Sequence, residues 1–212
     1  MILFSRPEYD FPTRYTSRWA KKIVDFARDK GYDVADLGPK RAKRKTIESF
    51  FKRHDISLAM FSGHGGPDRL YGQDGEPIVT AGENVYILEA VIVYSVACRS
   101  ALILGPEAIS QGAKAYVGYK RDFSFTYTRK KTSDVLSDER ARPFFKASNL
   151  VVISLLKGHN AGYAVERSKN SFQDSIGKLM TSEATDNDIF DATLLSWNMV
   201  NQVCLGDPGA SL

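Results

Sequence analysis

Residues 57–66 read SLAMFSGHGG, an apolar run that ends in a glycine-rich turn around His64. A second apolar run, AVIVYSVA at residues 90–97, ends directly at Cys98. Short apolar runs bounded by turn residues are typical of strands buried on both faces of an α/β sheet. Catalytic groups in such sheets gather beyond the carboxyl ends of the strands. A histidine and a cysteine at the same sheet edge are the minimum set for catalysis by a thiolate nucleophile.

The segments around these two runs alternate between strand and helix patterns. Residues 14–30 carry apolar side chains at helical spacing and end at Gly31, whereas residues 32–37 alternate apolar and polar side chains. This order predicts an α/β fold, a sandwich of helices around a central, mostly parallel sheet of about six strands. We expect strands at 1–4, 32–37, 57–61, 90–97, 115–119 and 200–205, a hairpin at 70–71 and 78–79, and helices at 14–30, 46–54, 102–111, 141–157, 160–181 and 187–199.

The composition is ordinary for one soluble globular domain. The chain has 212 residues, of which 43% are hydrophobic and 25% are charged. We expect a single domain over residues 1–206, followed by a frayed tail at 207–212. The net charge of +4 comes from basic residues spread along the chain. The densest cluster, KRAKRK at 40–45, fits a solvated surface, so direct contact with nucleic acid is not expected.

Targeting signals and cysteine usage both favour a reduced, cytoplasmic protein. The chain opens on no signal-peptide pattern, and no apolar run approaches the roughly 18 residues of a membrane span. The two cysteines, Cys98 and Cys204, have neither the number of a disulfide framework nor the spacing of a zinc site. We therefore expect no membrane contact and no structural zinc ion, and the family resemblance described below implies that no metal ion or organic cofactor is needed.

Cys98 has two interpretations when it is taken alone. A free thiol has a pKa of about 8.5, so it needs a neighbour that stabilises the thiolate. A nearby imidazole and the N-terminal end of the helix expected at 102–111 would both lower its pKa. The alternative is a small apolar side chain that closes a buried strand, which is the usual position of a free cysteine.

His64 lies between Gly63 and the pair Gly65-Gly66, which allow the backbone to turn sharply and to approach a ligand. The amides of Gly65 and Cys98 would together form an oxyanion hole with two donors. The alternatives are a glycine-rich turn with an incidental histidine, or a phosphate-binding loop. The phosphate loop has little support because neither standard glycine-rich phosphate motif is present.

The remaining histidines and the second cysteine have simpler interpretations. His54 ends a predicted helix, and His159 lies in an expected turn between helices, so both fit structural or surface roles. Cys204 lies on an expected edge strand and fits a buried position.

Taken together, these motifs resemble the caspase-like cysteine peptidases, which include caspases, metacaspases, gingipains, separase and bacterial CHAT domains. The pattern is an apolar strand into His-Gly, here AMFSGHG at 59–65, and then an apolar strand into Ala-Cys, here VYSVAC at 93–98. The segment GAKAYVGY at 112–119 is similar to the following strand in gingipain-like and CHAT members. The segment NQVCLGDP at 201–208 is similar to the closing Gly-Asp-Pro segment of gingipain-like domains.

The resemblance implies a caspase-like fold and a cysteine peptidase without a cofactor. Cys98 would attack the scissile carbonyl, His64 would protonate the leaving amine, and the amides of Gly65 and Cys98 would hold the oxyanion. The resemblance also implies a protein or peptide substrate. The residues alone do not identify the group that orients His64.

The same resemblance places the substrate pocket and implies a charged residue at P1, the position before the scissile bond. The matching segments contain Arg6, Glu8, Arg99, Arg121 and Asp122. Asp122 or Glu8 at the floor of the pocket would favour Arg or Lys, and Arg6 or Arg121 would favour Asp or Glu. The gingipain-like features favour a basic P1. The simpler interpretation of these charges is a solvated rim.

Regulation is expected to come from outside the active pair. The polar segment 120–140, with Arg129-Lys130-Lys131, is expected to be a mobile activation or substrate loop. By analogy with the family, we expect an activating or inhibitory partner protein in a bacterial defence or death pathway. The main alternative is a non-catalytic caspase-like scaffold with an inert Cys98. A hydrolase acting on acyl or phosphate esters is a further alternative.

Overall fold

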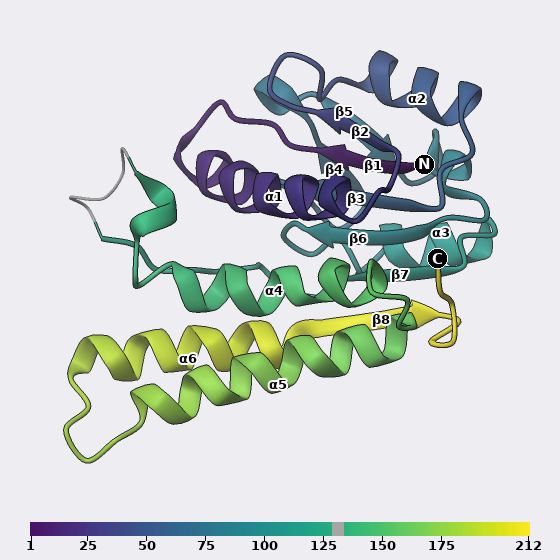
Figure 1. The fold of residues 1–212 in the computed structure, drawn as a ribbon. Helices are drawn as coiled ribbons and strands as arrows, with labels where there is room; N and C mark the ends of the chain where they lie inside the picture. Colours follow the sequence, from purple (N-terminus) through teal and green to yellow (C-terminus); the bar gives the residue numbers. More distant parts are fainter. Residues whose placement is uncertain (129–133) are drawn as a thin grey trace.

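A six-stranded sheet forms the centre of the molecule in the computed structural model, which describes residues 1–128 and 134–212. The strand order is β2-β1-β3-β6-β7-β8 (Figure 1). Neighbouring strands from β2 to β7 pair in parallel, and β8 pairs antiparallel to β7 at one edge. The predicted α/β fold with a central, mostly parallel sheet is confirmed.

The elements follow the expected order along the chain. The large sheet comprises β1 (Ile2–Ser5), β2 (Val34–Leu37), β3 (Leu58–Ser62), β6 (Ile92–Val96), β7 (Ala115–Tyr119) and β8 (Gln202–Gly206). The predicted hairpin is confirmed as β4 (Arg69–Tyr71) and β5 (Pro77–Thr80). The helices are α1 (Phe11–Asp29), α2 (Arg44–Arg53), α3 (Leu104–Ser110), α4 (Arg142–Leu155), α5 (Ala161–Leu179) and α6 (Asp186–Asn201), with short 3-10 turns η1 (Gln73–Gly75), η2 (Val85–Leu88) and η4 (Val135–Ser137). None of the helices in the described ranges is long and apolar enough to cross a bilayer.

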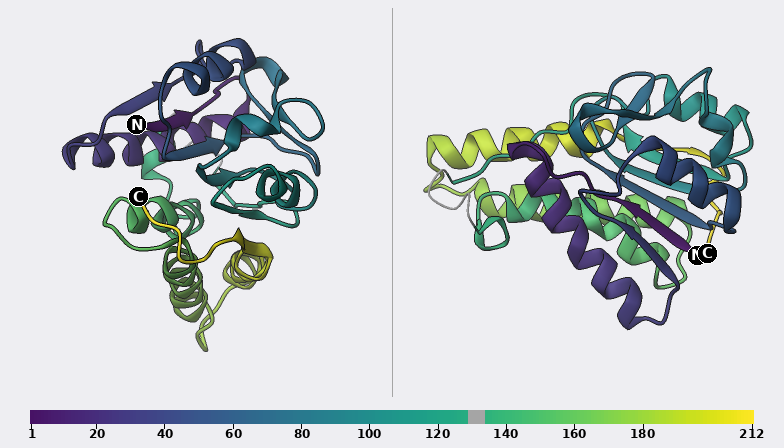
Figure 2. Two further views of the ribbon diagram at one scale, coloured as in Figure 1. Left: turned by 90° about the vertical axis from the view of Figure 1, so that its right-hand side faces the viewer. Right: turned by 90° about the horizontal axis from the view of Figure 1, so that it is seen from above.

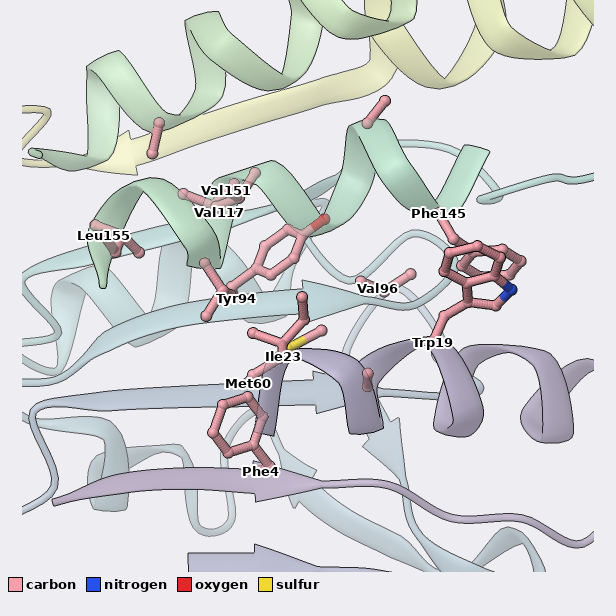
Figure 3. Close-up of a cluster of buried hydrophobic side chains, with 14 of the residues drawn as sticks. Phe4, Trp19, Ile23, Met60, Tyr94, Val96, Val117, Phe145, Val151 and Leu155 are labelled. Atoms are coloured by element: carbon pink, nitrogen blue, oxygen red, sulfur yellow. The ribbon is translucent and has the colours of Figure 1, made fainter. Parts of the chain in front are cut away.

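Alternating strand side chains build a core on each face of the sheet. Phe4, Met60 and Tyr94 pack on the face covered by α1 and α4, as Figure 3 shows. Leu3 and Ala59 point to the opposite face, where α2, α3 and the hairpin lie. Helices α5 and α6 pack outside α4, near β8 (Figure 2). Both faces of the parallel strands are therefore buried, as their continuous apolar sequences require.

Helix α1 begins at Phe11, before the predicted start at residue 14, because Asp10 caps it. The Asp10 carboxylate accepts a hydrogen bond from the Thr13 amide at 2.9 Å, and the Thr13 hydroxyl accepts one from the Asp10 amide at 3.0 Å. This reciprocal pair satisfies amides that a helix leaves free at its first turn. The cap also fixes the position of the Asp10 side chain.

Helix α3 corrects the expectation of a helix at 102–111. It covers only Leu104–Ser110, and residues 98–103 form turns instead. The amide dipoles of this helix are therefore not adjacent to Cys98, and their effect falls off within one turn. The expected lowering of the Cys98 pKa by a helix end is lost for this reason.

The C-terminal residues differ from their expected description. The tail expected to fray is bound to the start of α5, because the Ala161 amide donates to Ala210 at 2.9 Å and the Gly162 amide donates to Pro208 at 2.8 Å. Of the expected loop at 120–140, the basic cluster at 129–131 lies outside the described residues.

The aromatic cluster under α4 gives a test of the fold. Phe145 is 1% exposed and stacks on Trp19 with ring centroids 5.7 Å apart. Phe145→Ala should lower the free energy of unfolding by about 3–5 kcal/mol, measured by urea denaturation, because it leaves a cavity. Phe190→Ala is the matched control, since Phe190 is 55% exposed, and should change stability by about 0.5 kcal/mol or less. Equal effects of the two variants would contradict this packing.

Candidate active site

The turn that carries His64 packs directly against the backbone of Cys98. A Cβ atom on Gly65 would lie 2.8 Å from both the Ala97 Cβ and the Cys98 carbonyl oxygen, so only glycine fits there. Gly63 has a φ of +145°, and its amide donates to the Val96 carbonyl at 3.1 Å. These contacts join the end of β3 to the end of β6. The structure thus brings the two predicted motifs together at one edge of the sheet.

The Asp10 carboxylate holds the His64 ring and supplies the group that sequence analysis did not find. His64 Nε2 lies 2.6 Å from Asp10 Oδ2, while the cap hydrogen bond from Thr13 uses Oδ1. Both side chains are a little more than one-third exposed. Because Nε2 is engaged, Nδ1 is the ring nitrogen left to exchange a proton with a substrate. The only signal for Asp10 in the sequence is its place in a capping box before α1.

The Asp10 carboxyl is held in its charged form. Burial raises the pKa of Asp10. Hydrogen bonds from the side chain and amide of Thr13 and from His64 lower this pKa by more than burial raises it, so the net pKa is below its usual value. An ionised Asp10 fixes the orientation of the imidazole by accepting the hydrogen bond of its Nε2. The arrangement therefore suits a histidine that gives a proton to a leaving group.

Cys98 is partly buried, and its environment favours the neutral thiol. Its Sγ lies 3.8 Å from the Phe123 carbonyl oxygen. Burial raises the pKa of Cys98, the charge of Asp122 raises it further, and Arg99 opposes this more weakly. Within the described ranges, no hydrogen bond joins Cys98 to His64. The expected lowering of the Cys98 pKa is therefore wrong for this state of the chain.

The two amides expected to form the oxyanion hole belong to segments in close contact. A Cβ atom on Gly65 would lie 3.3 Å from the Cys98 nitrogen. In the part of the chain that the structure describes, neither amide donates a hydrogen bond to another protein group. Two neighbouring free donors beside a nucleophile are the arrangement that stabilises a developing oxyanion.

The backbone directly after Cys98 is strained and is held by its neighbours. Arg99 has a φ of +54°, a left-handed conformation that costs a non-glycine residue about 1–3 kcal/mol. Its amide donates to the Arg121 carbonyl at 3.1 Å, and the Ala101 amide donates to Tyr119 at 3.1 Å. Ser95 and Ser100 share a buried hydrogen bond of 2.6 Å beneath this turn. Such strain at the end of a strand is typical of a turn that presents a reactive side chain.

The expected pocket residues separate into two groups. Arg99 and Asp122 lie beside Cys98 and form an ion pair, with Arg99 Nε 2.9 Å from Asp122 Oδ1. Arg6 is buried and forms a bidentate pair with Asp36 at 2.7 and 2.9 Å. That geometry uses the buried Arg6 guanidinium to join the end of β1 to β2, so it is not free to pair with a substrate.

Glu8 and Arg121 line two different cavities of the surface. Glu8 accepts three hydrogen bonds from Arg18, at 3.2, 3.0 and 2.9 Å, and both residues line a polar cavity of about 380 Å³ with Arg14 and η4. Arg121 and Asp122 line a wider groove of about 690 Å³ against α6.

Helix α6 positions the segment that contacts Cys98, a role that sequence analysis missed. The Trp197 indole N–H donates to the Asp122 carbonyl at 2.8 Å. The Asn198 side chain accepts from the Ser124 amide at 3.0 Å and donates to the Ser124 carbonyl at 2.6 Å. These side chains supply hydrogen bonds to a segment that follows the last residue pair of β7 and β8, Tyr119 with Gln202. In the sequence, Trp197 and Asn198 are not distinguished from the other residues of a predicted helix.

The other candidates lie outside this cluster. His54 packs on Phe50 at the end of α2, and His159 packs on Tyr163 before α5. Cys204 lies on β8, where burial raises its pKa. Among residues 1–128 and 134–212, no group of three or more His, Cys, Asp or Glu side chains is arranged to hold a metal ion.

Solved structures with the same fold include gingipain R from Porphyromonas gingivalis. The complex of the RgpB pro- and mature domains superposes with a TM-score of 0.66 and 14% identity, over 99% of this chain and 47% of that chain. The Arg-specific cysteine proteinase gingipain R gives a TM-score of 0.60 and 14% identity, over 100% and 46%. A third structure, described only as a protease, gives 0.59 and 12%, over 99% and 47%.

These likenesses define the class of fold as gingipain-like, within the caspase-like α/β folds, as the sequence predicts. The chain spans about half the length of each of these three structures. Its sequence matches no family model and no curated protein.

The Asp10 carboxyl predicts a dependence of stability on pH. Its folded pKa is below the unfolded value of about 3.9, so its contribution is present above that pH and is lost as the pH falls through the folded pKa. Asp10→Asn keeps a good helix cap but no charge. The difference in unfolding free energy between the native protein and this variant should therefore shrink as the pH falls below about 4, in urea titrations. A difference that does not change with pH would contradict the role of the charge.

The charges around Cys98 predict opposite effects of two substitutions. In a Cys204→Ser background, Asp122→Asn should move the pH midpoint of Cys98 alkylation down, because it removes a negative charge. Arg99→Gln should move the midpoint up, because it removes the positive charge that opposes Asp122. Iodoacetamide alkylation rates measured against pH test both shifts. An unchanged midpoint in Asp122→Asn would contradict the electrostatic account.

Proposed function

We propose that this chain is a cysteine endopeptidase in which Cys98 is the nucleophile and His64 is the general acid. The observation that carries the proposal is the His64–Asp10 hydrogen bond of 2.6 Å, in a turn that packs against the Cys98 backbone. An oriented histidine, a cysteine and two adjacent free amides are the parts that acyl transfer requires. The fold shared with cysteine proteinases is consistent with this function.

The proposed reaction runs through a thioester. Cys98 passes its proton to Nδ1 of His64 and attacks the scissile carbonyl carbon, forming a C–S bond and an oxyanion between the amides of Gly65 and Cys98. The C–N bond breaks as His64 protonates the leaving amine through Nδ1. Water then attacks the thioester, releases the acid product and restores the Cys98 thiol. The Asp10 carboxylate keeps the His64 ring oriented throughout.

We propose that the substrate carries a basic P1 residue and that Asp122 binds it. In the free chain, the Arg99 guanidinium forms an ion pair with the Asp122 carboxylate, with Nε 2.9 Å from Oδ1. The two side chains are 47% and 58% exposed. Exposed ion pairs contribute little to stability, so an incoming guanidinium can replace Arg99 as the partner of Asp122. That exchange also places a second positive charge near Cys98, which favours its thiolate. The neighbour described as Arg-specific supports the same preference.

We further propose that a partner protein activates the chain in a bacterial defence or death pathway. The raised pKa of Cys98 in the free chain supports a resting state that needs activation. The resemblance to small caspase-like peptidases supports the pathway. A lone chain with a kcat/KM already within the usual enzyme range of about 10⁴–10⁸ M⁻¹ s⁻¹ would contradict the need for a partner.

One observation favours a second candidate, a non-catalytic scaffold on the same fold. The Cys98 Sγ faces the Phe123 carbonyl oxygen at 3.8 Å, and its pKa is raised, as in a buried inert cysteine. The free Gly65 and Cys98 amides and the engaged His64 favour the peptidase, because a scaffold does not need them.

Fluorogenic peptides that differ only at P1 test the peptidase proposal. Cleavage after Arg or Lys should exceed cleavage after Asp, and Cys98→Ala should abolish it. Asp122→Asn should lower kcat/KM for the Arg peptide by about 10- to 100-fold, because the cation loses its partner. Glu8→Gln is the control, since Glu8 is engaged by Arg18, and should retain the preference. No cleavage, together with Cys98 alkylation that is no faster than that of Cys204 at any pH, would favour the scaffold.

A further inference from the structure

A groove of about 420 Å³ lies between α1 and α4, away from His64 and Cys98. Its apolar lining comes from Ile23 and Phe26 on α1 and from Leu150 and Ile153 on α4. Phe26 and Ile153 are only partly buried, so apolar surface is left open to an occupant. The volume falls within the range of small-molecule sites, about 300–1,000 Å³.

The polar lining of this groove is cationic. Lys22, Arg142 and Lys146 surround it, and none of its lining residues within the described ranges is acidic. Lys22 Nζ lies 5.0 Å from the centroid of the Trp19 ring, and Arg142 pairs with Glu139 at 2.7 Å on the exposed surface. In the described part of the chain Lys146 has no ion-pair partner. Apolar surface inside a cationic rim is complementary to an amphipathic anion.

A buried hydrogen-bond donor lies in the wall of the same groove. Trp19 is 5% exposed, and its Nε1 has no acceptor among the described residues. Figure 3 shows its indole over Phe145, with the nitrogen on the side away from the other labelled core residues. Asn149 is also 5% exposed and donates to the Trp19 carbonyl at 3.1 Å, which fixes the backbone there. An unpaired buried donor is unfavourable, and an acceptor atom on a ligand would satisfy it if binding shifted the Trp19 ring enough to expose the nitrogen.

We propose that this groove binds a small organic anion with an apolar body, such as a medium-chain carboxylate. The apolar body would lie on Ile23, Phe26 and the facing residues of α4, and the anionic end would lie near Lys146 and Lys22. This assignment is independent of the peptidase proposal, because it uses no residue of the candidate active site.

Calorimetric titration with octanoate, using 1-octanol as the neutral probe of equal chain length, tests the proposal. We expect saturable binding of one octanoate, tighter than that of 1-octanol by about 10-fold. The double variant Lys22→Ala, Lys146→Ala should reduce octanoate binding to the level of 1-octanol. Trp19→Phe keeps an aromatic ring but removes the donor, and should weaken binding by a few fold. Lys178→Ala, an exposed lysine on α5, is the control and should leave binding unchanged.

Several results would overturn the proposal. One is equal binding of octanoate and 1-octanol, and another is no saturation up to about 10 mM octanoate. A third is octanoate binding that the double lysine variant leaves unchanged. Binding of an acidic amphipathic peptide in the absence of octanoate binding would assign the groove to a protein partner and would also overturn it. The lysine variants alter only exposed side chains, so they remain informative if Trp19→Phe is destabilised.

Discussion

The parallel register between β3 and β6 is the constraint on which the candidate site depends. Ser62 is paired with Val96, so His64 and Cys98 each lie two residues beyond a matched pair. Parallel strands that start from this register deliver their following residues to the same edge at the same height. A slip of one residue would turn every side chain of one strand to the opposite face and would separate the two motifs. The side chains of these strands pack into two different cores, so that slip would misfit the close packing on both faces.

Close packing at the glycines of the His64 turn then brings this turn into contact with the end of β6. The Gly65 position leaves no room for a Cβ against Ala97 and Cys98, and the Gly63 turn packs on Pro7. Pro7 leads into the cap of α1, so the same turn also meets Asp10. Three separate chain segments therefore converge through close contacts, and their side chains need little freedom to form the site. This rigidity is what a preorganised oxyanion hole needs.

The sequence predicted the parts of the site that follow from strand ends. His64, Cys98 and the glycine turn are local to apolar runs, and the alternation of strands and helices predicts where those runs meet. Asp10 and Asn198 could not be found in this way, because a helix cap and a helical asparagine have many local explanations. Their roles arise from contacts between segments that are far apart in the chain, such as Asn198 with Ser124. The raised Cys98 pKa was missed because it depends on burial and on Asp122, which only the fold places there.

Two independent demands act on the Asp10 carboxylate. Its Oδ1 accepts the hydrogen bond of the Thr13 amide at the start of α1, and its Oδ2 contacts Nε2 of His64. Ser, Thr or Asn would cap the helix but would bring no charge to the histidine, whereas Glu would bring the charge but caps poorly. Aspartate is the residue that meets both demands. If the charge were no longer needed, the cap alone would still restrict this position to Asp, Asn, Ser or Thr, so an aspartate retained there in a relative would not by itself distinguish an enzyme from a scaffold.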